Sequence, residues 1–83
     1  MLYKCECCGY YTLPEPSVGN YNICPVCNWE DDIAQLNYPD MAGGANEVSF
    51  NQARENYKAF GASEKRFIDN VRKPLPEELP ENN

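Results

Sequence analysis

Two cysteine pairs near the start of the chain constrain its fold more than any other feature of the sequence. Cys5 and Cys8 form the first Cys-x-x-Cys pair, and Cys24 and Cys27 form the second. Each such pair folds into a tight turn with both sulfurs on the same side, and two turns together supply the four soft ligands of a tetrahedral Zn²⁺ site. The spacing therefore predicts one metal site, closed by four thiolates with no position left for water.

A chain of 83 residues needs such a fastener, because its apolar core is expected to supply no more than about 3 to 5 kcal/mol. Structural zinc contributes about 10 to 16 kcal/mol in finger-like peptides. Disulfides would require an oxidising compartment, but no charged segment followed by an apolar stretch precedes the cysteines, and no run of about 18 apolar residues occurs. We therefore expect metal-dependent folding and a cytoplasmic location.

A fifth cysteine, Cys7, makes the register of the first turn ambiguous, because it could replace either neighbour as a ligand. The residue after each pair resolves the choice. A knuckle turn has a left-handed backbone just past its second cysteine, which Gly adopts freely and Asn tolerates. Gly9 follows Cys8, and Asn28 follows Cys27. The two pairs therefore match when Cys7 stays outside the metal shell, as a small buried thiol.

The ligand set also limits the chemistry of the ion. The chain has no histidine, whereas catalytic zinc sites often use one and leave a position open, so we expect a structural site and no enzyme. Iron is the alternative ion, because rubredoxins also hold their ion in two knuckles, which the segments 8–10 and 24–27 resemble. Ligand identity does not separate the two ions, but the shorter joining loop and the different downstream half favour zinc.

The residues around the second pair favour short elements. Aromatic and β-branched residues at 10–13 and 21–23 favour two strands, and the turn-forming residues 14–20 favour a hairpin between them. Residues 30–39 allow at most two helical turns, and the glycines at 43–44 indicate an irregular loop.

The second half of the chain favours helices. Ser49 precedes Gln52 at capping-box spacing, apolar side chains recur at helical spacing (Phe50, Ala53, Tyr57, Phe60), and Gly61 suits the end of a helix over 50–60. A second helix is predicted between Ser63 and Pro74. The sequence thus predicts a small α+β domain over residues 1–80, with zinc-ribbon or rubredoxin-like hairpin knuckles in 1–30, two short helices in 48–73 and an extended proline-rich tail in 74–83.

Charged and aromatic residues outside the cysteine pairs have simpler interpretations. Trp29 is expected to cover the sulfurs. Residues 30–32 (Glu30, Asp31, Asp32) are expected to form a solvated acidic turn, with a docking patch for a basic partner and a second metal site as the alternatives. Four basic residues are expected on a solvated face of the second helix, with contact to an acidic partner or RNA as the alternative: Lys65, Arg66, Arg72 and Lys73. The net charge of −6 disfavours nucleic acid as a partner and suits a basic protein.

Several segments in order give the chain a family resemblance over nearly its whole length: YKCECCGYYTLPE, ICPVCNWEDD, GGANEVSFNQAREN, FGASEKRF and VRKPLPEELP. In these segments the chain resembles the cysteine-rich CPCC family of small bacterial proteins. The resemblance implies zinc binding, and it implies that the acidic segment, the GGAN loop and the tail belong to one folded unit. Glu6 stands where the family motif has Pro, which removes no ligand.

These observations predict a non-enzymatic, structural-zinc-binding protein of the bacterial cytoplasm that acts as a protein-interaction module. Three alternatives remain open: an acidic inhibitor or immunity protein of a basic toxin, a nucleic-acid-binding zinc ribbon, and a rubredoxin-like iron electron carrier. No small-molecule substrate and no membrane partner is implied.

Overall fold

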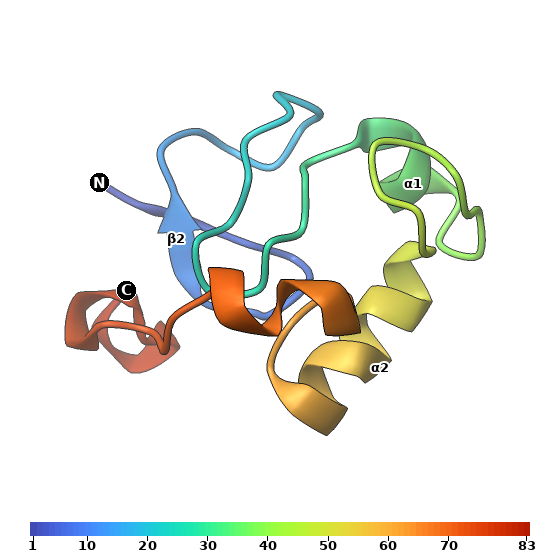
Figure 1. The fold of residues 1–83 in the computed structure, drawn as a ribbon. Helices are drawn as coiled ribbons and strands as arrows, with labels where there is room; N and C mark the ends of the chain where they lie inside the picture. Colours follow the sequence, from blue (N-terminus) through green and yellow to red (C-terminus); the bar gives the residue numbers. More distant parts are fainter.

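Each cysteine pair closes its own small hairpin in the computed structural model, which describes residues 1–83 (Figure 1). Strands β1 (Tyr3–Lys4) and β2 (Tyr11–Leu13) pair antiparallel on either side of the first cysteine turn, with Tyr3 opposite Leu13. Around the second turn, Ile23 and Glu30 form a single antiparallel bridge.

The predicted pairing of 10–13 with 21–23 is therefore wrong, although the strand β2 itself is confirmed. A Cys-x-x-Cys turn reverses the chain within a few residues, so the segments that flank the same turn are the closest available partners. The residues 14–20 do not form a tight hairpin turn. Instead the last four of them, residues 17–20, wrap around the buried carboxylate of Asp31.

The two α-helices follow local signals in the sequence. Helix α1 (Ile33–Asn37) begins at Asp32, whose side chain accepts hydrogen bonds from the backbone N–H groups of Ala34 and Gln35. Helix α2 (Phe50–Phe60) has Ser49 as its N-cap and ends at Gly61 with φ +83°. The predictions of a short helix in 30–39, an irregular loop at the two glycines and a helix over 50–60 are all confirmed.

The chain after Gly61 differs from the prediction in two ways. The expected α-helix is a 3-10 helix over Lys65–Asn70 that contacts α2. Ser63 does not cap it, because this residue is buried against the second knuckle, where its backbone N–H donates to the carbonyl of Cys27 at 2.7 Å and its hydroxyl has no hydrogen-bond partner. The tail is not extended: it forms two 3-10 turns, Pro76–Glu78 and Pro80–Asn82. Each turn begins with a proline, whose missing backbone N–H would have no acceptor at that position. The first of these turns packs against β2.

The buried core is small and consists largely of cysteine. Four of its eight members are cysteines, and the remaining four are Leu13, Val26, Trp29 and Ala53. The core therefore coincides with the surroundings of the sulfurs rather than lying beside them. None of the helices combines the length and the apolar character needed to cross a bilayer.

Candidate metal centre

The four cysteines of the two pairs bring their sulfurs together between the knuckles. All four Sγ atoms lie within 4.8 Å of one another, and the Cys5–Cys27 and Cys8–Cys24 Sγ distances are both 3.7 Å. A tetrahedral Zn²⁺ site with bonds of about 2.3 Å has sulfur–sulfur edges of about 3.8 Å. A disulfide needs about 2.05 Å, and every cysteine of the chain is a free thiol. The cluster thus has the spacing of a tetrathiolate site and can hold a metal ion.

The backbone of the two knuckles is equivalent residue by residue. The N–H of Gly9 donates to the carbonyl of Cys5, and the N–H of Asn28 donates to the carbonyl of Cys24, both at 2.8 Å. Gly9 and Asn28 have φ values of +84° and +68°, the left-handed conformation predicted for both positions. The first cysteine of each pair also donates to the carbonyl five residues on, at 2.8 Å (Cys5 to Tyr10) and 3.0 Å (Cys24 to Trp29).

Cys7 lies outside this cluster. Its side chain is buried, with 6 % exposure, but it is absent from the group of sulfurs that can share one ion. The turn brings the sulfurs of Cys5 and Cys8 to the second knuckle, whereas the sulfur of Cys7 does not join them. Cys7 borders a surface pocket, whose wall Cys8 also reaches. The four residues that the sequence analysis names as ligands are therefore the four that the fold brings together.

Three donors support the sulfurs of the second pair. The backbone N–H groups of Val26 and Trp29 point to the sulfurs of Cys24 and Cys27, each at 3.4 Å, and the hydroxyl oxygen of Thr12 lies 3.0 Å from the sulfur of Cys24. Such hydrogen bonds stabilise a thiolate and orient it toward a metal. The sequence analysis missed Thr12, because nothing local to strand β2 indicates which side chain faces the sulfurs.

The close packing of four thiols also governs their protonation. Hydrogen bonds from Cys27, and then from Cys5 and Cys8, hold the pKa of Cys24 well below its usual range. The pKa of Cys8 and that of Cys27 shift in the opposite direction and are raised, chiefly by the hydrogen bond to Cys24. Four adjacent thiolates repel one another unless a cation lies between them. A divalent ion would let all four sulfurs ionise together.

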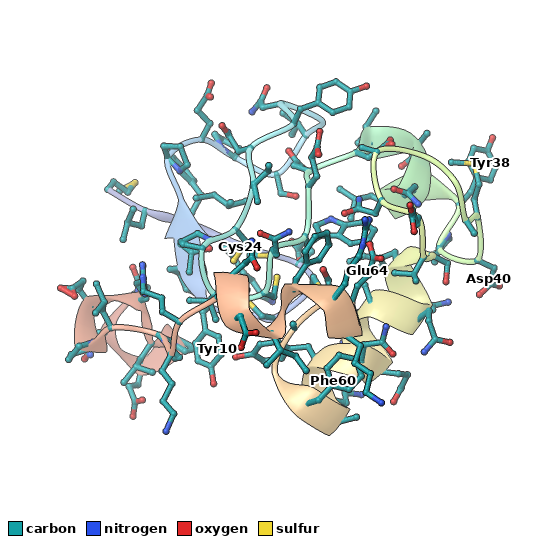
Figure 2. The ribbon with its side chains drawn as sticks, in the orientation of Figure 1. Tyr10, Cys24, Tyr38, Asp40, Phe60 and Glu64 are labelled. Atoms are coloured by element: carbon teal, nitrogen blue, oxygen red, sulfur yellow. The ribbon has the colours of Figure 1, made fainter.

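Aromatic side chains shield the cluster from water. Cys24 and Cys27 are fully buried, and the labelled Cys24 lies near the middle of the molecule (Figure 2). Trp29 is buried in the same cluster as the sulfurs, and its ring meets that of Phe50 edge-on, with 5.4 Å between centroids. The predicted covering position of Trp29 is confirmed. Burial, and then the nearby charge of Cys8, raises the pKa of Tyr57.

The acidic segment after Trp29 is not a solvated turn, so that prediction is wrong. Asp31 is 1 % exposed, and its carboxylate accepts hydrogen bonds from the backbone N–H groups of residues 18–20 and from the hydroxyl of Ser17, at 2.8 to 3.1 Å. Asp32 is also buried; it caps α1 and accepts from the N–H of Ala45 at 2.9 Å. The two carboxylates tie distant loops to the second knuckle.

A buried amide pair extends this loop framework. Gln35 is fully buried, and its side-chain oxygen accepts from both the backbone and side-chain N–H groups of Asn46 at 3.1 and 2.9 Å. Asn46 in turn pairs with the backbone of Glu30, accepting at 2.9 Å and donating at 2.8 Å. The irregular loop before α2 is therefore fastened to the residue that follows Trp29.

The predicted basic face of a second helix does not form, because the four basic residues lie on different segments. Arg66 pairs with Glu64 at 2.9 Å, and Arg72 lies beyond the 3-10 helix, where it forms a two-pronged pair with Glu78 at 2.8 and 2.9 Å. The hydrogen bond from Arg72 lowers the pKa of Glu78 below its usual range. Desolvation opposes this shift, and the hydrogen bond from the backbone N–H of Leu75 adds to it.

A family model described as cysteine-rich CPCC matches residues 3–78. The chain belongs to this family. The match begins in β1 and ends at Glu78, so the CPCC pattern takes in both knuckles, the buried acidic segment and the residue that anchors the tail. The comparison with curated proteins returned no match.

Proposed function

We propose that this CPCC protein binds one structural zinc ion through Cys5, Cys8, Cys24 and Cys27, and that it serves as a non-enzymatic protein-interaction module in the bacterial cytoplasm. The observation that carries the proposal is the overlap of the sulfur cluster with the core: three of the four proposed ligands belong to the eight-residue core cluster, and the fourth, Cys8, packs against it. Without an ion at its centre, such a core would consist of a few apolar side chains around four competing thiols. The ion is therefore a fastener for the fold.

The preference for zinc over iron rests on the sequence. The loop that joins the knuckles is shorter than in a rubredoxin, and the half of the chain after the knuckles differs from one. A closed set of four thiolates leaves no coordination position for a substrate or water, which favours a structural role over a catalytic one.

An exposed apolar patch beside the second knuckle supports the interaction role. Val18, Tyr21 and Ile33 are 59, 58 and 43 % exposed, and the loop that carries the first two is held against α1 by Asp31 and by contact of Gly19 with Ile33. Tyr21 has φ +58°, an uncommon conformation for a bulky residue. Glu15 and Glu30 flank this loop. The patch suits a partner with an apolar surface and a basic rim.

Elemental analysis of the purified protein, combined with single Cys-to-Ser changes at all five positions, tests the metal assignment. We expect one zinc per chain, and we expect serine at any of the four proposed ligands to lose the metal and the folded amide spectrum. Serine at Cys7 should keep both. Iron at one equivalent with visible absorbance would replace zinc, and metal retention in a ligand variant with loss in C7S would overturn the register.

A paired capture experiment tests the interaction surface. The immobilised zinc-loaded protein is compared with Tyr21→Ser and with Tyr38→Ser, which removes another exposed tyrosine from outside the patch. A specific partner should be lost with the first variant, kept with the second and released by salt. Capture that is the same for both variants would exclude the patch.

A further inference from the structure

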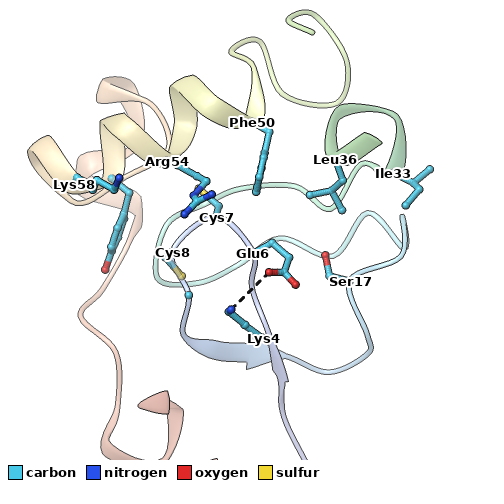
Figure 3. Close-up of a pocket in the computed structure, with 12 residues that line it drawn as sticks. Lys4, Glu6, Cys7, Cys8, Ser17, Ile33, Leu36, Phe50, Arg54 and Lys58 are labelled. Carbon is cyan, nitrogen blue, oxygen red and sulfur yellow. Dashed lines mark ion pairs between the residues drawn. The ribbon is translucent and has the colours of Figure 1, made fainter. Parts of the chain in front are cut away.

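A pocket of about 580 Å³ lies on the side of the molecule where Cys7 and Cys8 form part of its wall. Figure 3 shows its walls: β1 contributes Lys4, α1 contributes Leu36, and three residues spaced four apart on α2 contribute Phe50, Arg54 and Lys58. Residues at this spacing lie along one stripe of a helix. One side of α2 therefore borders the pocket from its first turn to its last.

The pocket gathers positive charge in an acidic protein. Three of the seven Lys and Arg residues of the chain line it, while the net charge of the whole chain is −6. Lys4 meets Glu6 at 3.8 Å and Lys58 meets Glu55 at 3.5 Å, both as solvent-exposed pairs, which contribute little and exchange readily. Arg54 forms no ion pair; its guanidinium lies 5.7 Å from the centre of the Phe50 ring. The pocket thus has a guanidinium free to bind an anion.

The other part of the pocket wall is apolar. Phe50, Leu36 and Ile33 line it, and Figure 3 shows them away from Lys58, with Leu36 and Ile33 on α1 itself. The volume is within the range of pockets that hold small ligands, which typically combine apolar walls with a few polar anchors. One end of the pocket has a guanidinium and an ammonium, with an aromatic ring beside them. This arrangement suits a ligand with a charged head and an apolar body.

We propose that this pocket binds a small organic anion, with a carboxylate or phosphate head on Arg54 and Lys58 and an apolar body on Phe50 and Leu36. This binding site shares Ile33 with the edge of the apolar patch but uses neither Val18 nor Tyr21, and it does not depend on which ion the cysteines hold. The competing role for the cations is to offset the charge of the tetrathiolate site, since Cys8 also borders the pocket. The two roles differ in whether the pocket takes a ligand.

The experiment is a titration of the metal-loaded, ¹⁵N-labelled full chain, followed by amide chemical shifts. The probes are phenyl phosphate, which carries both parts, inorganic phosphate, which has only the head, and benzyl alcohol, which has only a neutral body. We expect saturable shifts in residues 4–9 and 50–58 with phenyl phosphate, and at least about tenfold weaker binding of either part alone. Arg54→Gln should weaken phenyl phosphate binding by about tenfold.

Lys65→Gln is the matched control, because it removes one positive charge at an exposed residue outside the pocket. It should leave the affinity unchanged. Absence of saturable shifts, or equal weakening by both variants, would overturn the proposal. The proposal would also be overturned if the parent protein bound no probe and Arg54→Gln lost its metal. In that case the cations would serve the metal site. Metal content is measured on every sample, so failure of the zinc assignment is recognised separately.

Discussion

Replacement of Asp31 tests whether the buried acidic segment holds the fold together. Its carboxylate accepts four hydrogen bonds, three of them from the successive backbone N–H groups of residues 18–20. Hydrogen bonds to a charged group contribute about 1.5 to 3 kcal/mol each. Their sum overstates the loss, because residues 18 and 20 are exposed and their N–H groups would be hydrated in the variant.

We therefore expect Asp31→Ala to lower the free energy of unfolding by about 3 kcal/mol. Asp31→Asn keeps one oxygen that can accept from the three N–H groups, and its new amide N–H can donate to the hydroxyl oxygen of Ser17. The loss of unfolding free energy should therefore be about half as large. Glu30→Gln is the matched control. It removes the same charge from the preceding residue, whose side chain makes no hydrogen bond or ion pair and whose backbone alone is paired with Asn46, so a change within about 0.5 kcal/mol is expected.

Urea unfolding at a fixed free zinc concentration gives these differences, and amide hydrogen exchange locates them. In Asp31→Ala the amides of residues 18–20 should lose protection while those of α2 keep it. Equal effects of Asp31→Asn and Glu30→Gln, or a loss below about 0.5 kcal/mol in Asp31→Ala, would refute a structural role for this carboxylate and restore the interpretation of a solvated turn.

Other predictions concern the knuckles, the loop framework and the tail. Gly9→Ala should cost about 1 to 2 kcal/mol, since the new Cβ meets no atom but φ is +84°; a competing chelator should then report about 5- to 30-fold weaker zinc binding, whereas Asn28→Gly should change it less than threefold. Gln35→Leu removes the acceptor of the backbone N–H of Asn46 and of one of its side-chain N–H groups. It should lower the free energy of unfolding in urea by at least about 3 kcal/mol. Because Arg72 lowers the pKa of Glu78, tail anchoring should be intact above the ordinary value of 4.5 and disappear as pH falls through the lowered one. Carboxyl NMR of the wild type and of Arg72→Gln, in which the pKa should return toward 4.5, measures this; identical titrations would contradict it.

Local signals were sufficient for the features that depend on only a few neighbouring residues. The two Cys-x-x-Cys turns, the left-handed positions Gly9 and Asn28, and helix α2 between Ser49 and Gly61 all depend on backbone geometry that short stretches of sequence specify. The exclusion of Cys7 from the sulfur cluster follows from the same geometry. These elements were predicted with their boundaries because no distant contact competes with them.

Contacts between distant segments decided the rest. Asp31 is buried because three amides from a loop before the second knuckle converge on it. Ser63 caps no helix, because it is buried against the second knuckle and its N–H donates to the carbonyl of Cys27. The composition of residues 30–32 is equally compatible with a solvated turn, since a carboxylate is buried only where several donors already meet it. The pocket beside Arg54 likewise exists only where β1, α1 and α2 meet. The sequence by itself therefore determined the four sulfurs and the turns that carry them, whereas the tertiary structure alone decided what surrounds them, because burial and charge pairing depend on partners far away along the chain.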